Sequence, residues 1–294
     1  MTGADGLRER KMNADGKYAL TLTLLILSIA AAYILRLVVK GRARFERTDR
    51  QGGSWLLGKG VMELGYWGFL PAAQFLASMQ ISPNQVSWAS LAFGFAAGAC
   101  LSVGHFGFAA VCAALSSALD CLDGMVARIT KANSDAGELL DATVDRYAEF
   151  FFLAGLIVYY RAHPALQLLA LFALLGSFMV SYSSAKAEAM NIEPPRGNMR
   201  RPERAVYLDG GAMLSAITIP WLEAPPAGAV PIGYPMLVAL AIVAVAANIS
   251  AVARLWSIAR ALRAREEPRA KTLEEPTIVE AVEPRRSAGM EHSR

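Results

Sequence analysis

Four aspartates are the side chains of this chain best suited to chemistry: Asp120, Asp123, Asp141 and Asp145. They lie between two strongly apolar runs, each long enough to cross a bilayer. Carboxylates at membrane depth are costly unless cations neutralise them or they carry out a function. Residues three or four apart share one face of a helix, so the first two aspartates form one stripe and the last two form another. We therefore expect two acidic stripes on consecutive helices.

A short polar turn separates the two stripes, which predicts that the two helices are antiparallel neighbours with their acids facing one cleft. Four carboxylates in one cleft repel each other, and two hard divalent cations such as Mg²⁺ or Mn²⁺ match both their charge and their oxygen ligands. A pair of such ions can stabilise the attacking and leaving oxygens of phosphoryl transfer. Beside the acids, Gly124 and Ala127 are small enough to admit a ligand, and Arg128 offers a planar donor for phosphate oxygens.

The simpler alternative is a solvated loop in which the acids pair with Arg128, Lys131 and Arg146. The combined spacing of four acids with glycine, alanine and arginine favours a built site over that alternative.

Composition points to a polytopic helical membrane protein. Of the 294 residues, 54% are hydrophobic, and they are concentrated in long runs. The net charge of +4 is modest, and the basic residues gather in particular loops, which suits membrane orientation and lipid headgroups rather than nucleic acid. The three cysteines form no CxxC pair and the three histidines are scattered, which argues against a zinc site and a disulfide framework.

Seven apolar stretches are predicted to span the membrane, with basic loops on one side and the N-terminus on the other. These spans cover residues 18–39, 84–103, 108 into the acidic motif, 137–160, 165–185, 205–220 and 232–258. Residues 54–80 mix aromatic, charged and apolar side chains, which indicates an amphipathic helix at the interface. Ser82 followed by Pro83 predicts a helix start.

The chain divides into an N-terminal extension with one transmembrane helix (1–50), a core domain (51–262) and a charged, disordered tail (263–294). A cleaved signal peptide is the alternative for residues 18–39. The long polar lead and the absence of a small-x-small cleavage motif favour a retained helix.

The acidic motif, Asp120-x2-Asp123-Gly124-x2-Ala127-Arg128-x8-Gly137-x3-Asp141-x3-Asp145, resembles the full signature of the CDP-alcohol phosphatidyltransferases. The resemblance covers about residues 54–262. It implies an all-α, six-helix membrane core preceded by an interfacial amphipathic helix, with the helix at 18–39 as an addition.

This resemblance implies a role for each acid. Asp120 and Asp141 would bridge two Mg²⁺ or Mn²⁺ ions, Asp123 would ligate one ion and Asp145 the other. Asp145 would also accept the proton of an acceptor hydroxyl, which attacks CDP-diacylglycerol with release of CMP. The positions that match donor-binding residues are Pro83, Asn84, Gln85, Val86, Gly124, Ala127, Arg128 and Ser134.

The acceptor region resembles the phosphatidylinositol phosphate synthases of this family, so inositol phosphate is the expected acceptor and glycerol phosphate or another alcohol the alternative. The residues expected to bind the acceptor are Ser181, Lys186, Arg201, Arg204 and Arg254. Ser184 stands where those synthases carry lysine, and Lys186 where they carry arginine.

The resemblance further implies a homodimer in a lipid bilayer, with the active site on the cytoplasmic side of a bacterial inner membrane and no nucleic-acid partner. Two other classes remain open from the residues alone. A divalent-cation transporter would spread acids over several spans near the midplane. An aspartate-rich prenyltransferase would carry two separate acidic motifs, whereas this chain carries one composite motif.

Overall fold

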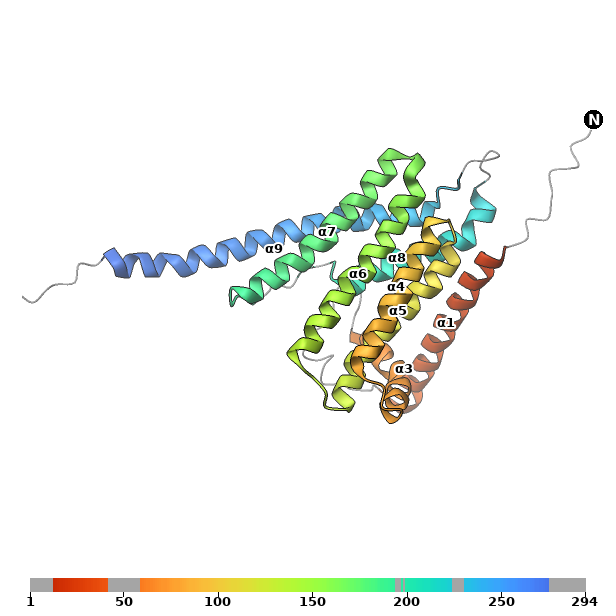
Figure 1. Cartoon of the computed structure of the whole chain (residues 1–294), viewed down its shortest axis with the longest axis horizontal. Helices are drawn as coiled ribbons and strands as arrows, with labels where there is room; N and C mark the ends of the chain where they lie inside the picture. The colour runs from red at the N-terminus through yellow and green to blue at the C-terminus, as the bar shows by residue number, and fades with distance from the viewer. Residues whose placement is uncertain (1–12, 42–58, 194–196, 198, 224–229, 275–294) are drawn as a thin grey trace, which may run out of the picture.

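The computed structural model describes residues 13–41, 59–193, 197, 199–223 and 230–274, and the regular structure within them is helical throughout (Figure 1). The first two helices are α1 (Ala14–Lys40) and α3 (Lys59–Ser78). The acidic motif lies on α5 (Phe106–Ile129) and α6 (Asp135–Tyr159), and α4 (Pro83–Ser102) precedes them. A 3₁₀ turn (Tyr160–Ala162) leads to α7 (Pro164–Ala189), α8 (Arg201–Leu222) and α9 (Tyr234–Glu274). Each predicted span therefore falls on a helix.

Two serines begin the helices that border the acidic motif. Ser82 is the N-cap of α4, and its hydroxyl accepts from the backbone N–H of Gln85, whose side chain accepts in return from the Ser82 N–H. This reciprocal capping box satisfies two backbone donors that a helix start leaves open. Ser134 caps α6 in the same manner by accepting from Gly137. Both helix starts are thus encoded locally.

The expectation that α5 and α6 are close antiparallel neighbours is wrong over most of their length. Helix α4 packs along both of them, and α5 and α6 contact each other only over a short stretch. Two glycines allow the close approach of α4 and α6. A Cβ on Gly98 would lie 2.1 Å from the Phe151 carbonyl oxygen, and one on Gly155 would lie 2.2 Å from the Gly98 oxygen. Helix α4 thus packs against both α5 and α6, which contact each other much less.

Five helices among the described residues are long and apolar enough to cross a membrane: those at Ala14–Val39, Phe106–Ile129, Pro164–Ala189, Arg201–Leu222 and Tyr234–Glu266. Large apolar side chains remain exposed on them, for example Leu27, Leu168 and Val245 at 59%, 55% and 59%. Such surfaces suit lipid rather than water, so the chain is an integral membrane protein. Spans at α4 and α6 remain predictions.

Helix α3 corresponds to the predicted amphipathic segment. It lies at one end of the bundle formed by α1, α4, α5 and α6 (Figure 1). Tyr66, Phe69, Leu70 and Ala73 pack against an apolar cluster of α4 and α5. Its place at the membrane interface stays a prediction.

The expectation of disorder beyond residue 262 is wrong for residues 263–274, which continue α9 without a break. Arginine, glutamate and alanine make up most of this stretch and have high helix propensity, although Pro268 lies within it. The rest of the predicted tail, and most of the polar lead before α1, lie outside the described residues.

Candidate active site

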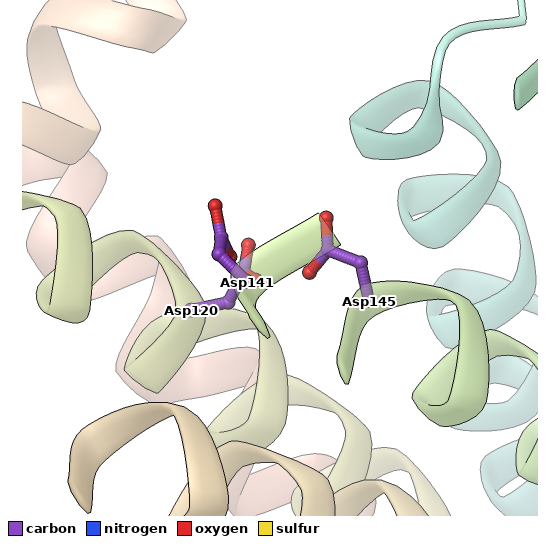
Figure 2. A group of neighbouring side chains, drawn as sticks. All are labelled: Asp120, Asp141 and Asp145. Atoms are coloured by element: carbon purple, nitrogen blue, oxygen red, sulfur yellow. The ribbon is translucent and has the colours of Figure 1, made fainter. Parts of the chain in front are cut away.

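Three of the four aspartates converge. Carboxylate oxygens of Asp120 on α5 and of Asp141 and Asp145 on α6 all lie within 4.8 Å of one another. Figure 2 shows the three side chains projecting into one space between the two helices. The helical spacing places Asp141 and Asp145 on one face of α6, and the splay of α5 and α6 leaves room between the acids.

A guanidinium group lies among these carboxylates. Arg201, the first residue of α8, places Nη1 2.7 Å from Asp120 Oδ2 and 2.6 Å from Asp145 Oδ1. One positive group therefore bridges the two helices. Arg201, predicted to bind the acceptor, contacts the acid cluster itself in this structure.

Asp123 is not part of this close group of carboxylates. Its Oδ2 accepts a 2.6 Å hydrogen bond from the Ser87 hydroxyl on α4, and the side chain is 4% exposed. Asp123 still lines the same cleft as Asp141. The bond to Ser87 engages only Oδ2, so Oδ1 can still serve as a ligand atom.

An open cleft of about 1080 Å³ lies on the α4 side of the acid cluster. Six of the eight predicted donor-binding residues line it: Pro83, Asn84, Gly124, Ala127, Arg128 and Ser134. We call this space the donor cleft. On the α5 side of this cleft, Gly124 and Ala127 contribute little side-chain volume, and Arg128 follows them in the lining.

Gln85 and Val86 do not line the donor cleft. The Gln85 side chain is engaged in the capping box with Ser82. Val86 is 3% exposed and packs with Leu122 and Val126 in the apolar cluster beneath α3. Both residues shape the start of α4, and the prediction that they contact the donor has no support in the geometry.

A second cleft of about 1120 Å³ lies on the α7 side and is lined by Asp141, Asp145, Ser181, Arg201 and Arg254, among others. We call it the acceptor cleft. Arg254 Nη1 donates to the Ser184 hydroxyl at 3.0 Å, and Nη2 donates to the Gly197 carbonyl oxygen at 3.2 Å. Ser184, at the position where the synthases carry lysine, therefore orients an arginine of this cleft.

Lys186 is exposed and does not line the acceptor cleft. The α7 residues that do line it include Ser181, Ser184, Ala185 and Glu188. This spacing of three, four and seven defines one face of the helix, and Lys186 lies off that face. The geometry therefore gives no support to the expected contact of Lys186 with the acceptor.

Arg204 lies in the wall of the acceptor cleft but is fully buried. Its Nε and Nη2 donate to Glu149 at 2.6 and 2.8 Å, and its Nη1 donates to the Met199 carbonyl oxygen at 2.7 Å. Such a bidentate pair fixes both side chains. Arg204, which was predicted to bind the acceptor, therefore joins α8 to α6 in this structure.

Sequence reasoning missed Glu149 and Ser87. Glu149 follows Asp145 by four residues and continues the acidic stripe of α6, so the spacing that identified the stripe could have found it. Ser87 lies one turn after Pro83 on the donor-cleft face of α4. No local pattern pairs it with Asp123, because that contact depends on how α4 and α5 pack.

The residues present fit a divalent cation site. Three carboxylates supply hard oxygen ligands at close range. The Oδ1 atom of Asp120 is buried and accepts no hydrogen bond, so it is available as a ligand atom. Arg201 already places positive charge at this point, as the charge balance of clustered acids demands.

Comparison with known proteins gives consistent results. The family model described as CDP-alcohol phosphatidyltransferase matches residues 80–256. A phosphatidylinositol phosphate synthase from Corynebacterium glutamicum is 33% identical over 158 residues, which cover 51% of this chain and 71% of that protein. A bifunctional IPC transferase and DIPP synthase from Archaeoglobus fulgidus is 34% identical over 151 residues, but the match covers only 30% of its length.

Solved structures are also similar. The Mycobacterium tuberculosis phosphatidylinositol phosphate synthase with CDP-DAG bound has a TM-score of 0.56 and 26% identity, covering 64% of this chain and 92% of that one. The same enzyme in complex with manganese and citrate has a TM-score of 0.56 and 27% identity, covering 64% and 87%.

Proposed function

Since this chain belongs to the CDP-alcohol phosphatidyltransferase family and is therefore a transferase, we propose that it moves the phosphatidyl group of CDP-diacylglycerol onto a hydroxyl of inositol phosphate, with release of CMP. One observation carries the proposal. Asp141 lines both the donor cleft and the acceptor cleft, so the acid cluster stands where the two spaces meet. A group transferred from one ligand to the other must pass this point.

The donor cleft suits a nucleoside diphosphate. Gly124 and Ala127 present little side chain, so a flat base or a diphosphate can approach the α5 backbone. Arg128 offers paired N–H donors to phosphate oxygens. Asn84 supplies an amide able to hydrogen-bond a base, and Ser134 stands at the N-terminus of α6, where helix N–H groups favour negative charge.

Asp120, Asp123, Asp141 and Asp145 would hold two Mg²⁺ or Mn²⁺ ions. When bound, the ions would neutralise the diphosphate and favour the alkoxide form of the acceptor. Asp145 would take the hydroxyl proton, because it lines the acceptor cleft and lies within the acid cluster. Arg201, which now bridges Asp120 and Asp145, would leave these carboxylates and face the incoming anion.

The acceptor cleft suits a phosphorylated polyol. Arg200, Arg201 and Arg254 line it, together with the Ser181 hydroxyl. Several arginines around one space provide the paired donors that a phosphate monoester requires. The cleft also carries carboxylates, among them Asp141 and Glu188, so the arginines would bind the phosphate while the acids face the hydroxyl groups of the polyol.

The relatives support this choice of acceptor and a bacterial setting. The Corynebacterium and Mycobacterium proteins are phosphatidylinositol phosphate synthases, and the mycobacterial enzyme has been solved with CDP-DAG and with manganese. From the family resemblance we also infer a homodimer in a bacterial inner membrane. The clefts would face the cytoplasm, because the loops rich in lysine and arginine flank them.

The test is an acceptor panel. Purified protein with radiolabelled CDP-diacylglycerol and Mn²⁺ or Mg²⁺ would receive inositol phosphate, inositol, glycerol phosphate or serine, and the lipid product and CMP would be measured. Inositol phosphate should give the highest kcat/KM. Preference for glycerol phosphate would refute inositol phosphate as the acceptor but leave the phosphatidyl transfer in place. Absence of CMP release with every acceptor would refute the transferase activity.

A further inference from the structure

Helices α1 and α3 lie outside residues 80–256, which the family model matches. Their contacts nevertheless reach the donor cleft. Three sets of contacts are involved: those of α1 with the N-terminus of α5, those of α1 with α3, and that of α3 with Arg128.

The outer part fastens the start of α1 to α5. The Asp15 carboxylate accepts hydrogen bonds from the backbone N–H of Gly107 at 2.8 Å and of Phe108 at 3.0 Å. It thereby caps a helix whose own N-cap residue, His105, makes no side-chain cap bond. A Cβ on Gly107 would lie 2.0 Å from the Asp15 carbonyl oxygen, so the two backbones are in direct contact.

The second part joins the other end of α1 to α3. The Tyr33 hydroxyl donates to Glu63 Oε2 at 3.2 Å, and the two residues are only 3% and 5% exposed. The Tyr33 ring also lies 5.6 Å from the Trp67 ring, and the Arg36 guanidinium lies 5.9 Å from that same ring. A buried hydrogen bond and two ring contacts thus restrain one face of α3.

The third part connects α3 to the donor cleft. The Arg128 guanidinium lies over the Tyr66 ring at 5.9 Å. Tyr66 is next to Trp67 in the sequence and three residues after Glu63, so a shift of α3 would move all three together. The apolar cluster beneath this contact contains Leu122, Met125 and Val126, which alternate along α5 with residues lining the donor cleft. Helix α3 therefore backs the cleft wall that ends in Arg128.

We propose that α1 and α3 form a positioning unit for the donor, in which Tyr66 holds the Arg128 guanidinium toward the diphosphate and the Tyr33–Glu63 bond holds α3 in register. This inference deepens the proposed function and rests on it for the identity of the ligand. Tyr66 is a positioning residue, since it acts through Arg128. The physical gain is that an exposed, flexible arginine is pre-oriented before the donor arrives.

The experiment measures equilibrium binding of CDP-diacylglycerol to the full chain in nanodiscs with Mn²⁺ and without acceptor. Tyr66→Ala should raise the Kd about two- to fivefold, the range for an exposed cation–π contact. Tyr66→Phe keeps the ring and should stay close to wild type. Phe75→Ala, an exposed aromatic on the same helix, is the matched control and should change nothing.

Two double-mutant cycles test whether Tyr33 acts through Tyr66, and Tyr66 through Arg128. Tyr66→Ala should add no further loss of donor affinity in an Arg128→Ala background. Tyr33→Phe should weaken donor binding in the wild type but not in a Tyr66→Ala background, whereas Tyr18→Phe at the other end of α1 should be silent. Fully additive effects, or a Tyr66→Ala variant equal to Phe75→Ala, would overturn the proposal.

A third readout separates this proposal from the proposed function. Thermal unfolding of the Tyr66→Ala and Arg128→Ala single and double variants measures their coupling without any ligand. Coupling supports the positioning unit even if the wild type releases no CMP, which would refute only the transferase. Absence of coupling in both binding and unfolding overturns the positioning unit even if the wild type is fully active.

Discussion

Replacing Glu149 by alanine while Arg204 remains should destabilise the fold by about 3–5 kcal/mol, the cost of leaving one charge of a buried pair without its partner. The Arg204 side chain is 1% exposed and that of Glu149 is 10% exposed, so water can replace little of the lost interaction. Three guanidinium nitrogens are engaged, two by Glu149 and one by the Met199 carbonyl oxygen. The pair also links α6 to α8, on either side of the acceptor cleft.

Thermal unfolding in detergent, followed by tryptophan fluorescence, measures the effect. A loss of that size should lower the Tm by roughly 6–20 °C. The matched control is Glu266→Ala, which removes an exposed carboxylate at the far end of α9 and should leave the Tm unchanged.

The double variant Glu149→Leu with Arg204→Met should recover most of the loss, because two apolar side chains can replace a buried ion pair at little cost. A Glu149→Ala variant that unfolds at the wild-type temperature would show that the Glu149–Arg204 pair does not stabilise the fold. The same would follow if Arg204→Met leaves the Tm intact and raises only the KM of the acceptor, since Arg204 would then be a ligand-binding residue.

Three further predictions concern the site and its scaffold. Asp145→Asn should lower kcat at least a hundredfold while CDP-diacylglycerol still binds in an equilibrium assay; wild-type turnover would remove the proton-acceptor role. Arg254→Ala should raise the acceptor KM about tenfold, whereas Lys186→Ala should leave it unchanged, and equal effects in steady-state kinetics would contradict the placement of α7. Gly98→Ala should lower the Tm by several degrees, because its Cβ would meet the α6 backbone, while Gly210→Ala, with open space around it, should not.

The sequence was sufficient for features that depend on one helix at a time. Spacing by three and four placed Asp141 and Asp145 together on α6, and the serine–proline pair predicted the start of α4. Most of the donor cleft was located by the family resemblance, and six of the eight residues so predicted line it. Local spacing decides which side chains share a face.

Features that depend on how helices pack could not be predicted in this way. Arg201 and Arg204 are three residues apart and both basic, yet one lies among the aspartates and the other is buried against Glu149. The close contact of α4 with α6 occurs at Gly98, which the sequence shows only as one glycine among many. Lys186 was assigned to the acceptor because its charge suits an anion, but it does not line the cleft in this structure.

The most direct test of the account measures metal binding and chemistry in one sample. Purified protein freed of metal would be titrated with Mn²⁺, with bound ions counted by electron paramagnetic resonance and CMP release followed from CDP-diacylglycerol and inositol phosphate. We predict that CMP release appears only as ions bind, saturates at two per chain, and is lost together with metal binding in Asp141→Asn. Undiminished CMP release by the metal-free protein in excess chelator would contradict the central claim.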